Sequence, residues 1–263
     1  MKTKVKKIGD RIINQLISPY NTIVKIGNAL VFMGRGSFGC IHRCIFFPQI
    51  FTISTVVAKI GDFCQINSTS QILIGGEHIN ENVIINTFSE STHLLEYIKK
   101  KSAITTRNNG MVTIGSNVIL SAGTTVLSGA TVGDNVLIAA GSIVRGTVDD
   151  NTIAAGVPVK TIKSLAQPSL KWWTLVEEDI VKYFNDEDLN SPKKYQLSNF
   201  HLVFDAKINS EGKASNFELI GAMSSGKFIP IKDFSESHLT YFKDAKDNGE
   251  YMIISDEVFD DLL

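Results

Sequence analysis

Residues 111–148 read MVTIGSNVILSAGTTVLSGATVGDNVLIAAGSIVRGTV, and aliphatic side chains recur in this stretch at every sixth position. These aliphatic residues are Ile114, Leu120, Val126, Val132, Ile138 and Val144. Four positions after each stands a small or β-branched residue, namely Val118, Thr124, Ala130, Val136, Ser142 and Val148. The residue just before it is Asn or Gly in five of the six hexads, and Asn and Gly adopt φ > 0 at low cost. Each hexad therefore predicts a short strand followed by a tight corner.

A six-residue period of this kind predicts a solenoid. Three hexads form one triangular coil, and successive coils stack at the spacing of β-strands, about 4.8 Å. The period also occurs upstream, from Ile60-Gly61-Asp62-Phe63-Cys64 to Ile66 and Ile72, with a looser copy at Ile26-Gly27. An ordinary sandwich of alternating strands is the alternative, and the unbroken register of six hexads disfavours it.

Other segments flank or interrupt the repeats. The expected domains are a capping helix at 1–20, a β-helix domain at 21–167 with a loop excursion at 79–110, a packing helix at 168–188 and an acidic α+β appendage of unknown role at 189–263. The excursion starts directly after His78, which favours a functional role over a tolerated insertion. The lysine-rich N-terminal helix is expected to cover the open end of the solenoid, and contact with a membrane surface is the alternative.

The C-terminal part of the chain predicts one further helix and several strands. Ser169 is a suitable N-cap for a helix that runs to about Asn185 and packs on the outside of the last coils. Beyond this helix, three segments with alternating apolar and polar residues lie between turn-forming segments. They are expected to form short strands and are HLVFDAKI (201–208), NFELIGAM (216–223) and KFIPI (227–231).

Composition restricts the function. The chain has 263 residues and a net charge of −1, although residues 186–263 alone carry 8 basic and 15 acidic residues. This balance gives no reason to expect nucleic acid as a partner. No run of 18 apolar residues and no secretory signal is present, so no transmembrane segment is expected. An odd set of cysteines, Cys40, Cys44 and Cys64, indicates reduced thiols and a cytoplasmic location, at most peripheral to the inner face of the membrane.

The repeats resemble those of the hexapeptide-repeat acyltransferases. Residues 114–144 and AAGVPVKTIK (154–163) carry the general likeness. IGDFCQINSTSQILIGGEH (60–78), GRGSFG (34–39), INTF (85–88) and WW (172–173) resemble the branch of xenobiotic and polysaccharide O-acetyltransferases. The resemblance extends over about residues 20–185. It implies a mainly β fold, a left-handed parallel β-helix, a homotrimer and acetyl-CoA as acyl donor.

The resemblance also implies site residues. His78, at the end of the GGEH motif, is the expected general base for an attacking hydroxyl, although a lone His is more often structural. Glu77 and Phe88 are expected in the substrate loop. Ala122 and Ala140 are one coil apart and are expected to line a groove for the pantetheine arm, while Arg145, Lys160 and Lys163 lie where relatives bind the nucleotide phosphates. For Arg145 a solvated surface charge is the alternative. Cys64, at an inward corner position, is expected to be buried.

These features together predict an acetyl-CoA-dependent O-acetyltransferase that acts on a sugar hydroxyl of a surface polysaccharide or its precursor. An antibiotic O-acetyltransferase and a non-catalytic hexapeptide scaffold are the alternatives. No His occurs between residues 94 and 200, so the coils lack the three histidines of a zinc site and no metal is expected. Thr113 stands where many relatives carry Trp, which leaves the acceptor open.

Overall fold

The structure is a computed structural model that describes residues 22–26, 29–39, 44–46, 55–75, 77–78, 106–107, 109–194, 200–208, 214–224 and 227–235. The expected capping helix at 1–20 and most of the excursion at 79–110, with Phe88, lie outside these residues. So do the side chains of Glu77 and His78, whose backbone is described.

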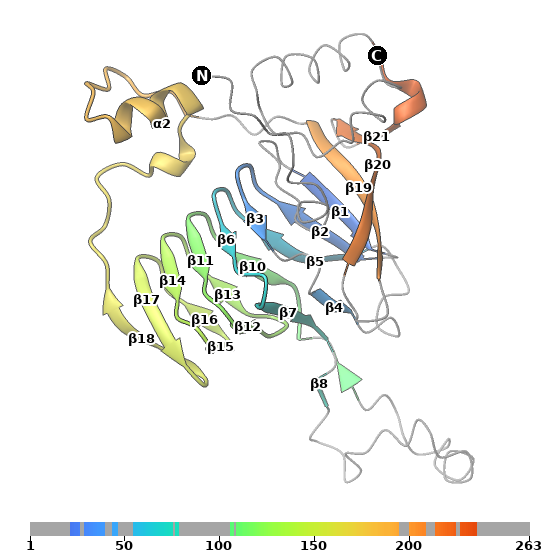
Figure 1. The fold of residues 1–263 in the computed structure, drawn as a ribbon, viewed down its shortest axis with the longest axis horizontal. Coiled ribbons are helices and arrows are strands. Elements are labelled where there is room, and N and C mark those ends of the chain that lie inside the picture. The colour runs from blue at the N-terminus through green and yellow to red at the C-terminus, as the bar shows by residue number, and fades with distance from the viewer. Residues whose placement is uncertain are drawn as a thin grey trace, which may run out of the picture.

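The chain forms a solenoid of three sheets in which the strands of successive coils pair in parallel, as the hexads predict (Figure 1). Sheet A contains β1 (Thr22–Ile26), β2 (Ala29–Met33), β5 (Thr55–Ile60), β10 (Val112–Ile114), β13 (Thr131–Val132), β16 (Thr147–Val148), β19 (Phe200–Ile208), β20 (Ala214–Ser224) and β21 (Lys227–Pro230). Sheet B contains β3 (Phe38–Gly39), β6 (Gln65–Ile66), β11 (Val118–Leu120), β14 (Val136–Ile138), β17 (Thr152–Gly156) and β18 (Val159–Ser164). Sheet C contains β4 (Cys44–Phe46), β7 (Gln71–Ile74), β12 (Thr125–Val126) and β15 (Ile143–Val144).

The coils stack in register, although the number of residues between successive coils varies along the axis. Asp134, on the corner between sheets A and B, accepts a hydrogen bond from Ser116, 18 residues earlier. The next step up the same corner, from Asp134 to Asp150, is only 16 residues. The preceding step, from Asp62 to Ser116, is 54 residues because it includes the excursion. The excursion therefore leaves and re-enters the stack without disturbing the pairing of the coils on either side.

The predicted inward positions form the core. All six aliphatic residues of the hexads, and all six small or β-branched residues four positions later, are buried. Asn117 and Asn135 (φ 56°) and Gly123 (φ 69°) turn the predicted corners. The sixth corner differs from the prediction, because Gly146 (φ 79°) and not Thr147 turns the chain there. The shortened coil moves this corner one residue back, and Thr147 becomes the first residue of β16.

One corner carries a ladder of asparagine side chains. The amide of Asn117 donates to Oδ1 of Asn135 (2.8 Å), and Asn135 in turn donates to Oδ1 of Asn151 (2.9 Å). All three residues have φ near 55°. The side chain thus supplies an inter-coil hydrogen bond at a position where the backbone requires Asn or Gly.

The two ends of the described chain meet at the first coil. β1 runs antiparallel to β2, so the predicted looser copy at Ile26 is not a coil of the solenoid. β19 pairs parallel with β1, followed by the antiparallel β20 and β21 (Figure 1). Leu202 and Phe204 of β19 are buried in the same core as Val24. The predicted C-terminal strands therefore form, and they extend sheet A and close its core at this end.

The segment after the last coil is mostly not helical. Residues Trp172–Thr174 form a single 3₁₀ turn, η3, and the helix α2 begins at Glu177 and ends at Phe184. The predicted start at Ser169 is wrong, since Leu175 is extended and bridges to Lys194. The predicted packing on the last coils is also wrong for the part around Trp172, whose ring contacts Phe63 near the start of the solenoid (centroids 5.2 Å apart). A second 3₁₀ turn, η4, spans Ile231–Asp233. Among the described helices, none has the length and hydrophobicity of a membrane span.

Candidate functional site

The residue expected as general base lies on a short hairpin that projects from the solenoid (Figure 1). β8 (Glu77–His78) pairs antiparallel with β9 (Thr106–Arg107), and the register sets His78 opposite Thr106 and Glu77 opposite Arg107. The hairpin stands between β7 of sheet C and β10 of sheet A. The GGEH motif is therefore placed where the chain leaves the corner between these two sheets.

The two predicted groove residues stack on a different corner. Ala122 and Ala140 both lie where the chain passes from sheet B to sheet C, and both are exposed. They are neighbours along the axis, because the amide of Gly141 donates to the carbonyl of Ala122 (2.8 Å). The predicted column of small residues thus exists, and nothing larger than a methyl group projects from it at these two positions.

The three predicted basic residues are exposed and distributed over two places. Arg145 follows β15 on the corner between sheets C and A, the corner from which the hairpin also leaves. Lys160 and Lys163 lie on β18 at the last edge of sheet B, opposite Ala155 and Ile153. The fold of one chain therefore assigns His78 and the Ala122–Ala140 column to separate corners.

Sequence reasoning missed a buried arginine. Arg35 of the GRGSFG motif is 1% exposed, and its Nε lies 3.1 Å from Oδ2 of Asp62. Its Nη2 donates to the carbonyl of Trp173 (2.8 Å), and its guanidinium lies 4.9 Å from the ring centroid of Phe63. Burial raises the pKa of the Asp62 carboxyl, and the contacts with Arg35 oppose that rise. The GRGSFG, IGDFC and WW segments, which carry the family resemblance, therefore meet at the Arg35 side chain. None of these motifs alone indicates that contact.

Cys64 is buried, as predicted. Its thiol lies 2.9 Å from the carbonyl oxygen of Gly115 in the next coil, and burial raises its pKa to about 12. A thiol with this pKa is protonated near neutral pH and is a poor nucleophile. Cys64 is a structural residue at an inward corner.

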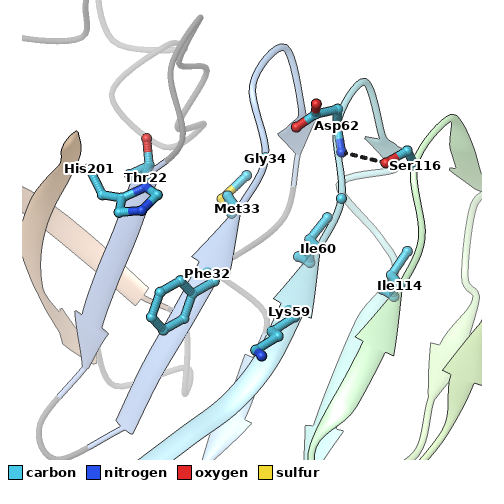
Figure 2. Close-up of a pocket in the computed structure, with 11 residues that line it drawn as sticks. Thr22, Phe32, Met33, Gly34, Lys59, Ile60, Asp62, Ile114, Ser116 and His201 are labelled. Carbon is cyan, nitrogen blue, oxygen red and sulfur yellow. Dashed lines mark hydrogen bonds between the residues drawn. The ribbon is translucent and has the colours of Figure 1, made fainter. Parts of the chain in front are cut away.

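A pocket of about 290 Å³ opens near the first coils on the outer side of sheet A (Figure 2). Phe32 and Lys59, which are direct neighbours in register, line it together with Asp62, Ser116 and His201. His201 comes from β19, so the C-terminal strands complete the pocket. The Nδ1 atom of His201 is buried and has no hydrogen-bond partner among the residues that the structure describes, and burial lowers the pKa of the ring. No group of three His, Cys, Asp or Glu suited to a metal occurs in the described ranges.

Comparison with known proteins agrees with the repeat. Residues 111–146 match the family model described as bacterial transferase hexapeptide (six repeats). The chain is 40% identical over 67 residues to WbbJ of Escherichia coli (strain K12), whose name describes a lipopolysaccharide biosynthesis O-acetyl transferase. That match covers 26% of this chain and 34% of WbbJ, so the chain spans about a third of this relative's length.

Solved structures of two acetyltransferases are also similar to the chain. One is a maltose O-acetyltransferase from Clostridium difficile 630, with 24% identity, 55% of this chain and 64% of that chain covered, and a TM-score of 0.38. The other is a hexapeptide-repeat-containing acetyltransferase from Vibrio cholerae O1 biovar eltor complexed with acetyl coenzyme A, with 17% identity, 55% and 61% covered, and a TM-score of 0.32.

Proposed function

Because residues 111–146 carry the hexapeptide repeats of bacterial transferases, we propose that the chain is an acetyl-CoA-dependent O-acetyltransferase. The acceptor is a hydroxyl of a sugar in a surface polysaccharide or its precursor. The observation that carries this proposal is the 40% identity to WbbJ, together with the intact GGEH motif at the base of the hairpin.

The reaction is a direct transfer. The acceptor oxygen attacks the thioester carbonyl as His78 accepts the hydroxyl proton, and a tetrahedral oxyanion forms. Its collapse breaks the C–S bond, and His78 passes the proton to the leaving thiolate. A backbone N–H of a neighbouring coil stabilises the oxyanion. Glu77 and Phe88 belong to the acceptor side of the site. An acyl-cysteine is not needed, and the high pKa of Cys64 argues against one at that position.

Acetyl-CoA lies along the Ala122–Ala140 column, with Arg145, Lys160 and Lys163 near the phosphates. His78 and this column lie at different corners of one chain, so we infer that a complete site combines His78 of one copy with the column of another. Three left-handed β-helices around a threefold axis give three equal sites of this kind. An interface between two faces also supplies the concavity that a coenzyme needs and that a flat sheet lacks.

The experiment is an assay of thiol release from acetyl-CoA with a panel of sugar acceptors. We expect turnover with at least one saccharide and a loss of about 10²–10⁴-fold in His78→Ala, with acetyl-CoA affinity preserved. Wild-type turnover in His78→Ala would remove this residue from the mechanism. Absence of thiol release with every acceptor would leave the scaffold alternative.

The shared site has its own test. Light scattering of the full chain is expected to give three times 28.9 kDa. Mixing His78→Ala subunits with Ala140→Trp subunits is expected to restore part of the activity, since some interfaces then combine an intact histidine with an open groove. A fully active monomer contradicts both the trimer and the shared site.

A further inference from the structure

The pocket on sheet A is separate from the proposed site of transfer. It lies beside Gly34, Gly61 and Asp62, at the end of sheet A from which the chain turns into sheet B. The hairpin with His78 leaves from the corner between sheets C and A, and the alanine column lies on the corner between sheets B and C. A ligand in this pocket therefore contacts none of the residues assigned to transfer.

The size of the pocket limits its ligand. A volume of about 290 Å³ is at the lower end of the range for small-molecule sites. It fits a single ring with its substituents and is small for a nucleoside diphosphate. A six-membered sugar ring is a ligand of suitable size.

The lining combines an apolar floor with a polar rim. Phe32 offers the apolar surface, and Figure 2 shows His201 on one side and Asp62 with Ser116 on the other. Aromatic rings bind ligands that have an apolar face and a polar edge, as sugars do. The hydroxyl of Ser116 accepts a hydrogen bond from the amide of Asp62 (3.1 Å) and can still donate its own proton.

The charges of the lining favour a negative group on that ring. The Asp62 carboxylate is engaged by the buried Arg35 through two hydrogen bonds, at 3.0 and 3.1 Å. Lys59 is exposed, stands directly beside Phe32 in register, and forms no ion pair with the acidic residues that the structure describes. An ammonium beside an aromatic ring suits a sugar that carries a carboxylate.

We propose that this pocket binds an acidic sugar unit, with Phe32 against the ring and Lys59 facing its carboxylate. The assignment of this unit to the polysaccharide acceptor rests on the proposed function, whereas the affinity of the pocket for an acidic sugar does not. In this proposal the pocket holds one sugar unit of the polysaccharide while another unit of the same polysaccharide is acetylated at the shared site.

Calorimetric titration of the full chain with D-glucuronate and D-glucose tests the proposal. We expect glucuronate to bind about tenfold more tightly than glucose. Lys59→Met is expected to bring the two sugars to similar affinity, and Phe32→Ala to weaken both by about tenfold. The matched controls are Lys227→Met, an exposed lysine on β21, and Leu30→Ala, a half-buried residue of β2 outside the pocket lining. Both controls are expected to bind as the wild type does.

Three results overturn the inference: glucose that binds as tightly as glucuronate, a Phe32→Ala variant with wild-type affinity, or binding of uridine monophosphate in place of either sugar. Thiol release from acetyl-CoA, measured on the same samples, separates this inference from the proposed function. Sugar binding without transfer would reject the function and keep the pocket. Acetyl transfer together with unchanged sugar binding in Lys59→Met and Phe32→Ala would keep the proposed function and reject the pocket.

Discussion

Arg35 and Asp62, which belong to successive coils, form an ion pair with Nε 3.1 Å from Oδ2, and Arg35 also holds the carbonyl of Trp173. The arginine side chain is 2% exposed, and that of Asp62 is 21% exposed. This pair connects the start of the solenoid to the segment that follows its last coil.

Arg35→Met is therefore expected to lower the free energy of unfolding by about 3 kcal/mol, because it leaves the half-buried carboxylate and the Trp173 carbonyl without their partner. Urea unfolding followed by circular dichroism measures this loss. Lys171→Met is the control, since it breaks an exposed ion pair with Asp134 (2.9 Å) and should cost less than about 1 kcal/mol. Equal losses in the two variants would show that the Arg35 pair is not structural.

The asparagine ladder predicts an unusual order of stabilities. Asn135→Ala loses two inter-coil hydrogen bonds and also forces alanine into φ 56°. Asn135→Gly loses the same bonds without that strain. We expect the alanine variant to be less stable than the glycine variant by about 1 kcal/mol in thermal unfolding. Ile119, an exposed residue in strand β11, is the control position. There we expect the usual order, in which the Ile119→Ala variant is more stable than Ile119→Gly.

Two phenylalanines of the C-terminal strands give a matched test of how sheet A is closed. Phe204 of β19 is 3% exposed and lies in the common core, whereas Phe228 of β21 is 46% exposed. Phe204→Ala is expected to destabilise the whole solenoid by about 3–5 kcal/mol. Phe228→Ala should cost less than about 1 kcal/mol. If residues 200–235 were an independent appendage, Phe204→Ala would leave the main unfolding transition unchanged, and urea unfolding distinguishes these cases.

His201 predicts a contribution to the pH dependence of stability. Burial lowers the pKa of this imidazole below its ordinary 6.5, so the folded chain takes up its proton less readily than the unfolded chain. The stability that His201 contributes is complete above pH 6.5 and decreases as the pH falls through the lowered pKa. Wild-type melting temperature should therefore decrease more between pH 8 and pH 5 than that of His201→Gln. Parallel curves for the two proteins would contradict the prediction.

Lys160 and Lys163 predict a selective effect on the coenzyme. If they meet the phosphates, Lys160→Ala and Lys163→Ala should weaken acetyl-CoA by about tenfold each, and the 3′-dephospho derivative by less. Calorimetry with both ligands measures the difference. The Lys193→Ala variant, which lies beyond α2, is the control and should keep wild-type affinity. Unchanged binding in both β18 variants would remove these residues from the coenzyme site.

The parts of this fold that depend on local period could be predicted from the sequence. Ile114, Leu120 and Val126 point inward because a six-residue repeat fixes which side chain faces the axis, whatever lies further along the chain. The strands of 200–230 could also be predicted from their alternation. The strand with which they pair could not be predicted. β19 lies beside β1, although the whole solenoid separates the two strands in the sequence, and a local pattern contains no information on such a pairing.

The candidate site shows the same limit. Ala122 and Ala140 stack because one coil separates them, which their spacing alone predicts. Arg35 could not be assigned, because its partners Asp62 and Trp173 come from distant segments that only the folded chain brings together. The predicted helix ends where expected, at Phe184, but its start at Ser169 was wrong for a related reason. The carbonyl of Trp173 and the backbone of Leu175 bond to other segments, and these tertiary bonds replace those of a helix.

The pairing of β1 with β19 has a consequence for the synthesis of the protein. Thr22 leaves the ribosome long before its partner Leu202, by roughly 10–40 s at ordinary rates of translation. During this interval each coil can add to the one made before it, but the edge of β1 and the apolar end of the stack stay uncovered. A nascent chain stalled before residue 200 is therefore expected to expose an unpaired sheet edge that can bind other polypeptides. Binding of chaperones to the nascent chain should be greatest late in translation.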